Sequence, residues 1–164
     1  MQKPQLRHAL KRLLGPEPSR PVVVLGVGSE MRSDDAAGLH VAAAVSRAGL
    51  PGVHAWEAGP APENLTAEIR RLRPATVIIV DSAHLGERPG TLKLVEPGEA
   101  GGASFGTHGL PLAVLAEYLR TEVGCSVIIL GIQPASVEVG EGVSQSVRKA
   151  VEEAASLLCD CLSP

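Results

Sequence analysis

The sequence predicts an α/β protein with a five-stranded, mostly parallel sheet. Three β-branched apolar runs, at residues 22–27, 76–80 and 126–132, are typical of strands buried on both faces. Amphipathic helical patterns separate these runs, and strands that alternate with helices favour βαβ units and a parallel sheet. The length of 164 residues suits a single domain, which we place at residues 21–164.

Residues 1–20 form a separate, basic segment before this domain. Apolar residues recur there at helical spacing, at Leu6, Leu10, Leu13 and Leu14, and Gly15 to Pro18 end the pattern. Charges interrupt the segment too often for a secretory signal, whereas a transit peptide or a membrane-surface helix is conceivable. We favour an amphipathic helical extension that packs on the domain.

The remaining elements follow in order between the buried strands. A helix opens at Ser33-Asp34-Asp35 and ends near Gly49, because Ser and Asp suit a helix N-terminus. A short turn at Pro89-Gly90 precedes the alternating strand 91–95, which favours an antiparallel strand there. The other predicted elements are a strand at 53–57, a helix at 62–72, a glycine-rich loop at 101–109, a helix around 112–119 and a final helix at 143–162.

Composition excludes several classes of function. The net charge is −3 and only 2% of residues are aromatic, which argues against a nucleic-acid binder and against base-stacking platforms. No apolar run reaches the ~18 residues that a membrane span needs. Three cysteines, an odd number without a secretory signal, indicate free thiols in a reducing compartment, so we expect a cytoplasmic protein.

Gly26-Val27-Gly28 follows a strand and precedes a helix, as in a dinucleotide site. The fingerprint requires a third glycine three residues later, and Met31 stands there instead. A nucleotide-binding module is therefore a weak hypothesis. The simpler interpretation is that these glycines permit a tight strand-to-helix turn.

Polar residues that could carry chemistry lie where the predicted strands end. Asp35 opens the helix after the first strand, Asp81 follows strand 76–80, and His108 lies in the glycine-rich loop. In open parallel sheets, function gathers at the carboxyl ends of the strands. The helix dipole and free backbone N–H groups suffice to explain Asp34. His84 lies three residues past Asp81 and ranks below His108.

Two carboxylates and one imidazole form a ligand set that suits a catalytic Zn²⁺ or Ni²⁺. A Ser/His/Asp arrangement built from Ser82 or Ser29 stays open, although the chain lacks a Gly-x-Ser-x-Gly elbow. A cysteine nucleophile is disfavoured, because no cysteine lies at a predicted strand end.

The run from Val24 to Gly38 resembles the opening motif of the [NiFe]-hydrogenase maturation endopeptidases. The resemblance covers about residues 21–160 and is nearest to the branch that serves formate-hydrogenlyase-type hydrogenases. One departure is Ser29, where the family commonly has Asn. The further matching segments are Ala61-Pro62-Glu63-Asn64, Val80-Asp81, Pro89-Gly90, the segment from Thr107 to Leu112, and Gly131-Ile132-Gln133-Pro134.

The resemblance implies an α/β/α sandwich with a five-stranded twisted sheet. It also implies that Asp35, Asp81 and His108 contact nickel and carry the catalytic site. In this family the nickel belongs to the large-subunit precursor, a transient partner whose C-terminal extension is removed after a basic residue. We expect a monomer that acts on this precursor. The alternative is a non-catalytic nickel-binding maturation factor with the same ligands.

Overall fold

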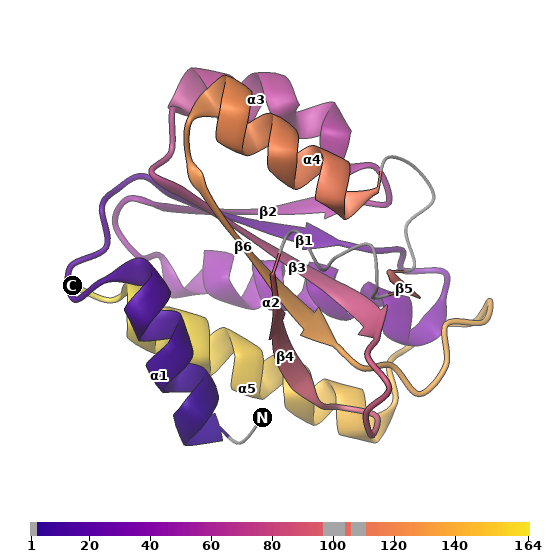
Figure 1. The fold of residues 1–164 in the computed structure, drawn as a ribbon. Coiled ribbons are helices and arrows are strands. Elements are labelled where there is room, and N and C mark those ends of the chain that lie inside the picture. The colour runs from indigo at the N-terminus through magenta and orange to yellow at the C-terminus, as the bar shows by residue number, and fades with distance from the viewer. Residues whose placement is uncertain (1–2, 97–103, 106–110) are drawn as a thin grey trace.

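The computed structural model describes residues 3–96, 104–105 and 111–164 and contains one central sheet. Its strands follow the order β2-β1-β3-β6-β4, and β2, β1, β3 and β6 are mutually parallel (Figure 1). A short strand, β5 (Ser104–Phe105), pairs antiparallel with the end of β3. The other strands are β1 (Val22–Val27), β2 (Val53–Gly59), β3 (Thr76–His84), β4 (Leu92–Val95) and β6 (Ser126–Ile132).

Helices cover both faces of the sheet and give the predicted three layers (Figure 1). On one face lie α1 (Lys3–Leu14), α2 (Ala37–Ala48) and α5 (Gln145–Leu162). On the other lie α3 (Thr66–Leu72) and α4 (Leu112–Tyr118). Short turns of tighter or wider helix adjoin them: η1 (Ser33–Ala36) before α2, η2 (Pro62–Leu65) before α3 and η4 (Leu119–Val123) after α4.

The core is aliphatic and lies in two clusters, one on each face of the sheet. Successive residues of β1 point to opposite faces, so Val22 and Val24 join one cluster while Val23 and Leu25 join the other. This two-sided burial is the physical reason for the uninterrupted apolar run in the sequence.

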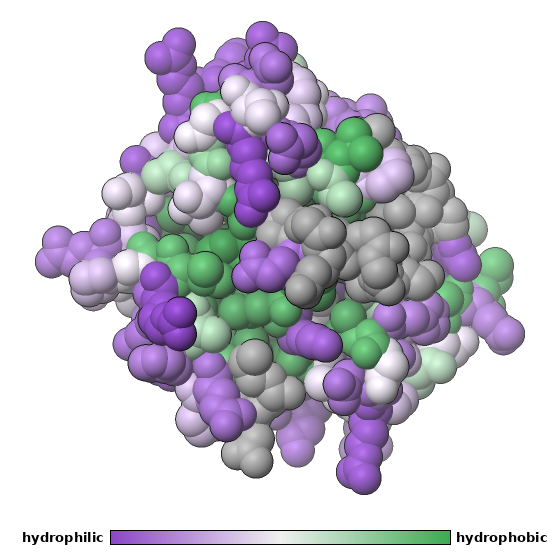
Figure 2. All heavy atoms as spheres, viewed as in Figure 1, coloured by the Kyte–Doolittle hydropathy of each residue, from purple (hydrophilic) through white to green (hydrophobic). Residues whose placement is uncertain are grey.

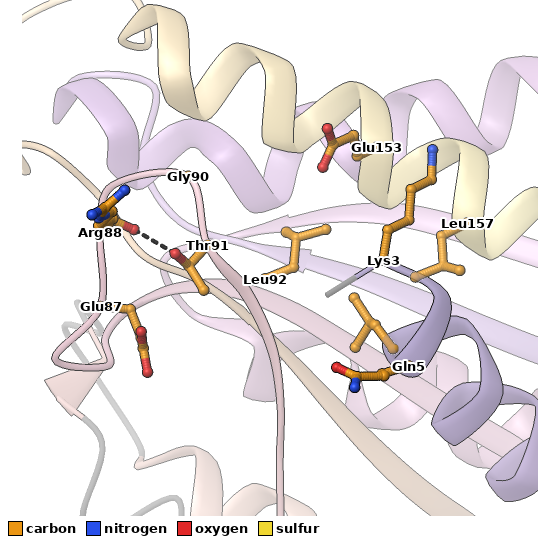
Figure 3. A pocket seen from close by; sticks show the side chains of 10 residues that line it. Lys3, Gln5, Glu87, Arg88, Gly90, Thr91, Leu92, Glu153 and Leu157 are labelled. Atoms are coloured by element: carbon orange, nitrogen blue, oxygen red, sulfur yellow. Dashed lines mark hydrogen bonds between the residues drawn. The ribbon is translucent and has the colours of Figure 1, made fainter. Parts of the chain in front are cut away.

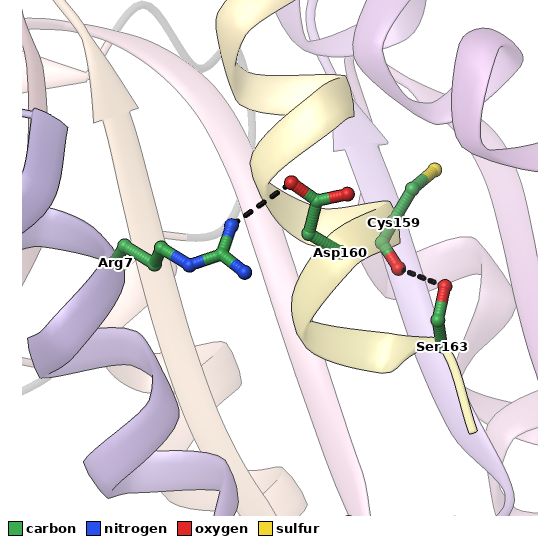
Figure 4. A network of polar contacts seen from close by, with 4 residues as sticks. All are labelled: Arg7, Cys159, Asp160 and Ser163. Atoms are coloured by element: carbon green, nitrogen blue, oxygen red, sulfur yellow. Dashed lines mark hydrogen bonds and ion pairs between the residues drawn. The ribbon is translucent and has the colours of Figure 1, made fainter.

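The N-terminal segment forms the expected amphipathic helix, and this helix packs on the domain. Leu6 and Leu10 of α1 are buried within the same cluster as residues of α5. Arg7 and Asp160 join the two helices at the surface through an ion pair of 2.9 Å (Figure 4). The apolar stripe, rather than this exposed pair, supplies the attachment, because surface ion pairs are worth ~1 kcal/mol or less.

One expectation about strands was wrong in detail. β3 does not end at Val80: it pairs with β6 as far as Ser82 and with β5 up to His84, so Asp81 lies inside the strand. The strand 91–95 is antiparallel as predicted, but its partner is β6, which lies between it and β3. The chain from β3 through the Pro89-Gly90 turn to β4 therefore skips one strand position. That position, next to β3, is occupied by β6, which comes later in the sequence.

The surface is mixed on the side seen in Figure 2. Apolar side chains gather near the middle, around the edge strand β4, and hydrophilic side chains project around the rim. All three cysteines are free, as expected, and Cys125 and Cys161 are buried. No helix in the described part of the chain combines the length and the apolar character needed to cross a bilayer.

Candidate active site

The turn from β1 into α2 brings the helix start very close to the strand ends. Gly28 has φ +144°, and a Cβ there would overlap the carbonyl oxygen of Asp35. A Cβ at Gly38 would likewise overlap the carbonyl oxygens of Val27 and Val80. The prediction of a tight strand-to-helix turn is therefore confirmed. Its consequence is that Asp35 lies against β3, instead of projecting into water.

Asp35 is fully buried at this junction, and only one of its two carboxylate oxygens is satisfied. Its Oδ1 accepts a hydrogen bond of 2.8 Å from the hydroxyl of Ser82. Its Oδ2 has no hydrogen-bond partner among the described residues. A buried carboxylate oxygen without a partner is costly, so the side chain is held ready for a ligand that can pair with it.

Asp81 precedes Ser82 in β3 and is also fully buried. Neither of its carboxylate oxygens has a hydrogen-bond partner in the described structure. Burial raises the pKa of Asp81 well above its ordinary value, and the negative charge of Asp35 raises this pKa further. The nearby backbone N–H of Ser82 lowers the pKa of Asp81 by a smaller amount, although it forms no hydrogen bond with either carboxylate oxygen of Asp81. The two carboxyl groups are thus electrostatically coupled.

Asp34 precedes Asp35 and has the opposite character. It is buried, but four hydrogen bonds satisfy its carboxylate. The N–H groups of Ala135 and Ser136 donate to Oδ2 at 2.8 and 3.2 Å. Ser144 donates its N–H to Oδ1 at 2.6 Å and its hydroxyl to Oδ2 at 2.9 Å. The explanation from its own helix N-terminus was wrong: Asp34 binds backbone donors of the β6–α5 connection and forms no cap of its own helix.

The third predicted ligand, His108, lies outside the described residues. Within residues 3–96, 104–105 and 111–164, no group of three or more His, Cys, Asp or Glu side chains is arranged to hold a metal ion. The structure thus brings Asp35 and Asp81 together, and the assignment of His108 stays a prediction. The exposed His84 stands at the end of β3, where it pairs with Ser104.

The described part of the site therefore offers three unpaired carboxylate oxygens in a dry environment. A cation placed between them would relieve both the desolvation of the carboxylates and their mutual repulsion. Carboxylate oxygens together with an imidazole nitrogen suit a divalent transition metal such as Ni²⁺. Asp35 and Asp81 could supply the carboxylate oxygens of such a set, and the imidazole of His108 stays a prediction.

Comparison with known proteins identifies the family. The family model described as "Hydrogenase maturation protease" matches residues 39–161. The Hydrogenase 3 maturation protease of Escherichia coli K12 is 37% identical over 131 residues, which cover 79% of this chain and 83% of the relative. The chain belongs to the hydrogenase maturation protease family. It is therefore a peptidase, and the expected family resemblance is confirmed.

Solved structures agree with this assignment. The [NiFe] hydrogenase maturation protease HycI of Thermococcus kodakarensis superposes with a TM-score of 0.84 at 30% identity, over 94% of this chain and 98% of the other. The endopeptidase HycI of E. coli superposes with a TM-score of 0.72 at 36% identity, over 80% and 84% of the two chains. The maturation protease fold is thus present essentially complete.

Three residues with buried polar atoms were missed in the sequence or given another role there. The buried Ser82 appeared in the sequence only as a possible nucleophile, yet its hydroxyl orients Asp35. Gln133 is buried and accepts the N–H of Leu85 at 2.6 Å, which fixes the segment after β3. Oε2 of Glu63 is buried without a partner among the described residues. Gln133 and Glu63 belong to segments that carried the resemblance, which was the available signal.

A pocket between α1 and α5 does not coincide with these carboxylates. It has a volume of about 440 Å³ and is lined by residues of α1, α5, β4 and the turn before β4 (Figure 3). Lys3, Glu87, Arg88 and Glu153 line it, so its wall carries charges of both signs. None of the predicted site residues lines this pocket, and it takes no part in the candidate site.

Proposed function

We propose that this maturation protease removes the C-terminal extension of a [NiFe]-hydrogenase large-subunit precursor and recognises the nickel already inserted in it. Family membership supports the peptidase activity, and relatives named for [NiFe] hydrogenase and Hydrogenase 3 support the substrate class. The observation that carries the nickel proposal is the set of unpaired, buried oxygens on Asp35 and Asp81.

In this proposal nickel is part of the substrate and the protease has no metal of its own. Asp35 and Asp81, together with His108, complete the coordination of nickel held by the precursor. Because the two carboxylates are desolvated and repel each other, a nickel-bearing precursor gains binding energy that an empty precursor cannot gain. The inserted metal thereby reports that insertion is complete, and it positions the chain for cleavage.

The raised pKa of Asp81 fits a protease that waits without metal. Burial and the Asp35 charge favour a protonated Asp81, so the free pair carries less negative charge than two ionised carboxylates. Arrival of nickel favours the ionised form, and the proton released is available near the scissile bond. We assign an aspartic-type endopeptidase whose activity depends on nickel. We further propose that it acts as a cytoplasmic monomer and binds its precursor transiently.

The test uses purified protease with a nickel-loaded precursor and with the same precursor lacking nickel. Mass spectrometry follows release of the C-terminal peptide. Only the loaded precursor is expected to be cleaved, and Asp35→Asn, Asp81→Asn and His108→Ala are each expected to abolish release while keeping the circular dichroism spectrum. Asp160→Asn, an aspartate exposed on α5, serves as the matched control and keeps full activity.

Two results would contradict the proposal. Equal cleavage of the nickel-free and nickel-loaded precursors would show that the protease does not recognise nickel. Stable capture of the loaded precursor without peptide release would instead indicate the non-catalytic nickel-binding factor.

A further inference from the structure

Exposed apolar side chains are unevenly placed on this protein. Among the described residues, four large apolar side chains are exposed: Leu13, Met31, Val114 and Val139, at 54%, 71%, 50% and 85%. The two most exposed, Met31 and Val139, lie on two different loops that leave the carboxyl ends of β1 and β6. This is the edge of the sheet at which Asp35 and Asp81 lie, so the pair adjoins the candidate site.

Backbone pairing brings Met31 and Val139 together. Arg32 and Gly140 form an isolated parallel bridge, and Gly140 donates its N–H to the carbonyl of Met31 at 3.0 Å. Ser33 donates in turn to the carbonyl of Gly140 at 2.9 Å. The hydrogen bond from Gly140 to Met31 places the backbones of Met31 and Val139 next to each other. The two exposed apolar side chains therefore project from adjacent backbone segments, and together they are here called the Met31–Val139 surface.

Further hydrogen bonds hold this surface in a fixed shape. Arg32 donates from Nε to the carbonyl of Val137 at 3.1 Å, and the hydroxyl of Ser33 donates to the carbonyl of Glu138 at 2.8 Å. Because these hydrogen bonds already hold the two loops, a partner that covers Met31 and Val139 does not have to order the loops on binding. The cost of their exposure is recovered when a partner covers them.

The Met31–Val139 surface is tied to the catalytic carboxylate by Asp34. Asp34 is adjacent to Asp35 in η1, and its carboxylate binds Ala135, Ser136 and Ser144 of the other loop. The distance between the surface and Asp35 is therefore set by partly buried hydrogen bonds. A chain bound on this surface would be positioned relative to Asp35, as cleavage at one bond requires.

The charges around the Met31–Val139 surface indicate which kind of partner can bind to it. Residues 29–33 and 135–144 contain three exposed acids, Glu30, Glu138 and Glu141, against one base, Arg32. Acids around an apolar centre favour a partner with the same arrangement and opposite charge.

We infer that the Met31–Val139 surface docks the precursor polypeptide by an apolar side chain that lies next to a basic residue. This inference rests on the proposed function and deepens it, because it assigns substrate contacts that are separate from nickel. In this arrangement, the nickel indicates that metal insertion into the precursor is complete. The Met31–Val139 surface binds the precursor polypeptide and positions it for cleavage.

The principal test is the double variant Met31→Ser/Val139→Ser, assayed on the nickel-loaded precursor. We expect KM to rise about tenfold, equivalent to ~1.4 kcal/mol of lost binding, with kcat within about twofold of the parent. Leu13→Ser, at an exposed apolar residue on α1, is the control and leaves both parameters unchanged.

A second pair of variants tests the acidic rim. Glu138→Gln/Glu141→Gln is expected to flatten the salt dependence of kcat/KM, because rim charges mainly steer association. Glu17→Gln/Glu152→Gln removes two exposed acids elsewhere and is expected to keep the parental salt dependence.

The outcomes separate this inference from the proposed function. If the parent protein cleaves the precursor and Met31→Ser/Val139→Ser leaves KM unchanged, or lowers kcat alone, the docking surface is overturned while the function stands. If the parent releases no peptide, the proposed function fails and the docking surface fails with it. A change of oligomeric state in the double variant, measured by sedimentation, would overturn the inference by assigning the surface to a second copy of this chain.

Discussion

Asp34→Ala removes the brace between the two loops at the candidate site. The carboxylate accepts four hydrogen bonds, the shortest at 2.6 and 2.8 Å, from Ser144 and Ala135. Each bond to a charged acceptor is worth ~1.5–3 kcal/mol, but the donors are only partly buried and the buried charge itself is costly. We therefore expect a loss of about 3 kcal/mol in unfolding free energy, well below the sum of the four.

Asp34→Asn separates hydrogen bonding from side-chain volume. The amide keeps one acceptor oxygen for the donors at Oδ2, but its NH₂ group faces the N–H of Ser144. The variant should therefore lose less stability than Asp34→Ala, about half as much. For a chain of this length, the alanine variant corresponds to a decrease in Tm of about 6–12 °C.

Urea unfolding at neutral pH measures these differences, and hydrogen exchange locates them. The amides of Ala135, Ser136 and Ser144 should lose protection in Asp34→Ala, whereas those of the buried strands should follow global stability alone. Asp160→Ala, which breaks the exposed pair with Arg7, is the control and should cost less than ~1 kcal/mol. An Asp34→Ala variant within 0.5 kcal/mol of the parent, by the ~1 kcal/mol scale of single bonds, would refute the role of the brace.

Four further outcomes are expected. Asp81→Asn should stabilise the free protein at pH 7, as measured by urea unfolding. Because the pKa of Asp81 is raised in the folded state, its contribution to stability is present below about pH 4 and is lost as pH rises through the folded pKa. The stability gained by the variant over the parent should therefore vanish at acid pH. Ser82→Ala should cost about 1–2 kcal/mol and lower peptide release, because Oδ1 of Asp35 loses its donor, while Ser82→Thr should restore part of both if the hydroxyl acts. Gly28→Ala should yield little folded protein by circular dichroism, because its Cβ would meet the Asp35 carbonyl at a positive φ. Leu10→Ala should cost about 2–5 kcal/mol in urea, and a change below ~1 kcal/mol would show that α1 is not part of the core.

The parallel part of the sheet could be predicted because its cause is local. A strand buried on both faces must be apolar at every position, and residues 22–27 and 127–132 show this without interruption. The extension of β3 to His84 could not be predicted in this way. Asp81 and Ser82 interrupt the apolar run, and the pairing that keeps them in the strand comes from β6, about fifty residues later. The same later strand separates β4 from β3.

The features of the candidate site that have local causes could also be predicted from the sequence, whereas those with distant causes could not. Asp35 and Asp81 were predicted together because the carboxyl ends of parallel strands meet at one edge, and the order of strands and helices already implies this. Asp34 was misinterpreted because the groups that bind it lie 101 to 110 residues away. The hydrogen bond from Ser82 to Asp35 could not be predicted, because the proximity of the two side chains depends on the close approach that Gly28 and Gly38 allow.

The contrast between Asp34 and Asp35 shows how the fold holds a costly group in place. The two residues are chain neighbours and equally buried, so desolvation alone does not distinguish them. Asp34 has four donors, whereas Asp35 has one and leaves Oδ2 unpaired. An unpaired carboxylate on a movable turn would rotate into water, and the hydrogen bonds of Asp34 oppose that movement because they fix η1 to the β6–α5 connection. The satisfied aspartate is therefore the reason that the unsatisfied one can remain buried, and loosening Asp34 should weaken the proposed nickel recognition as well as stability.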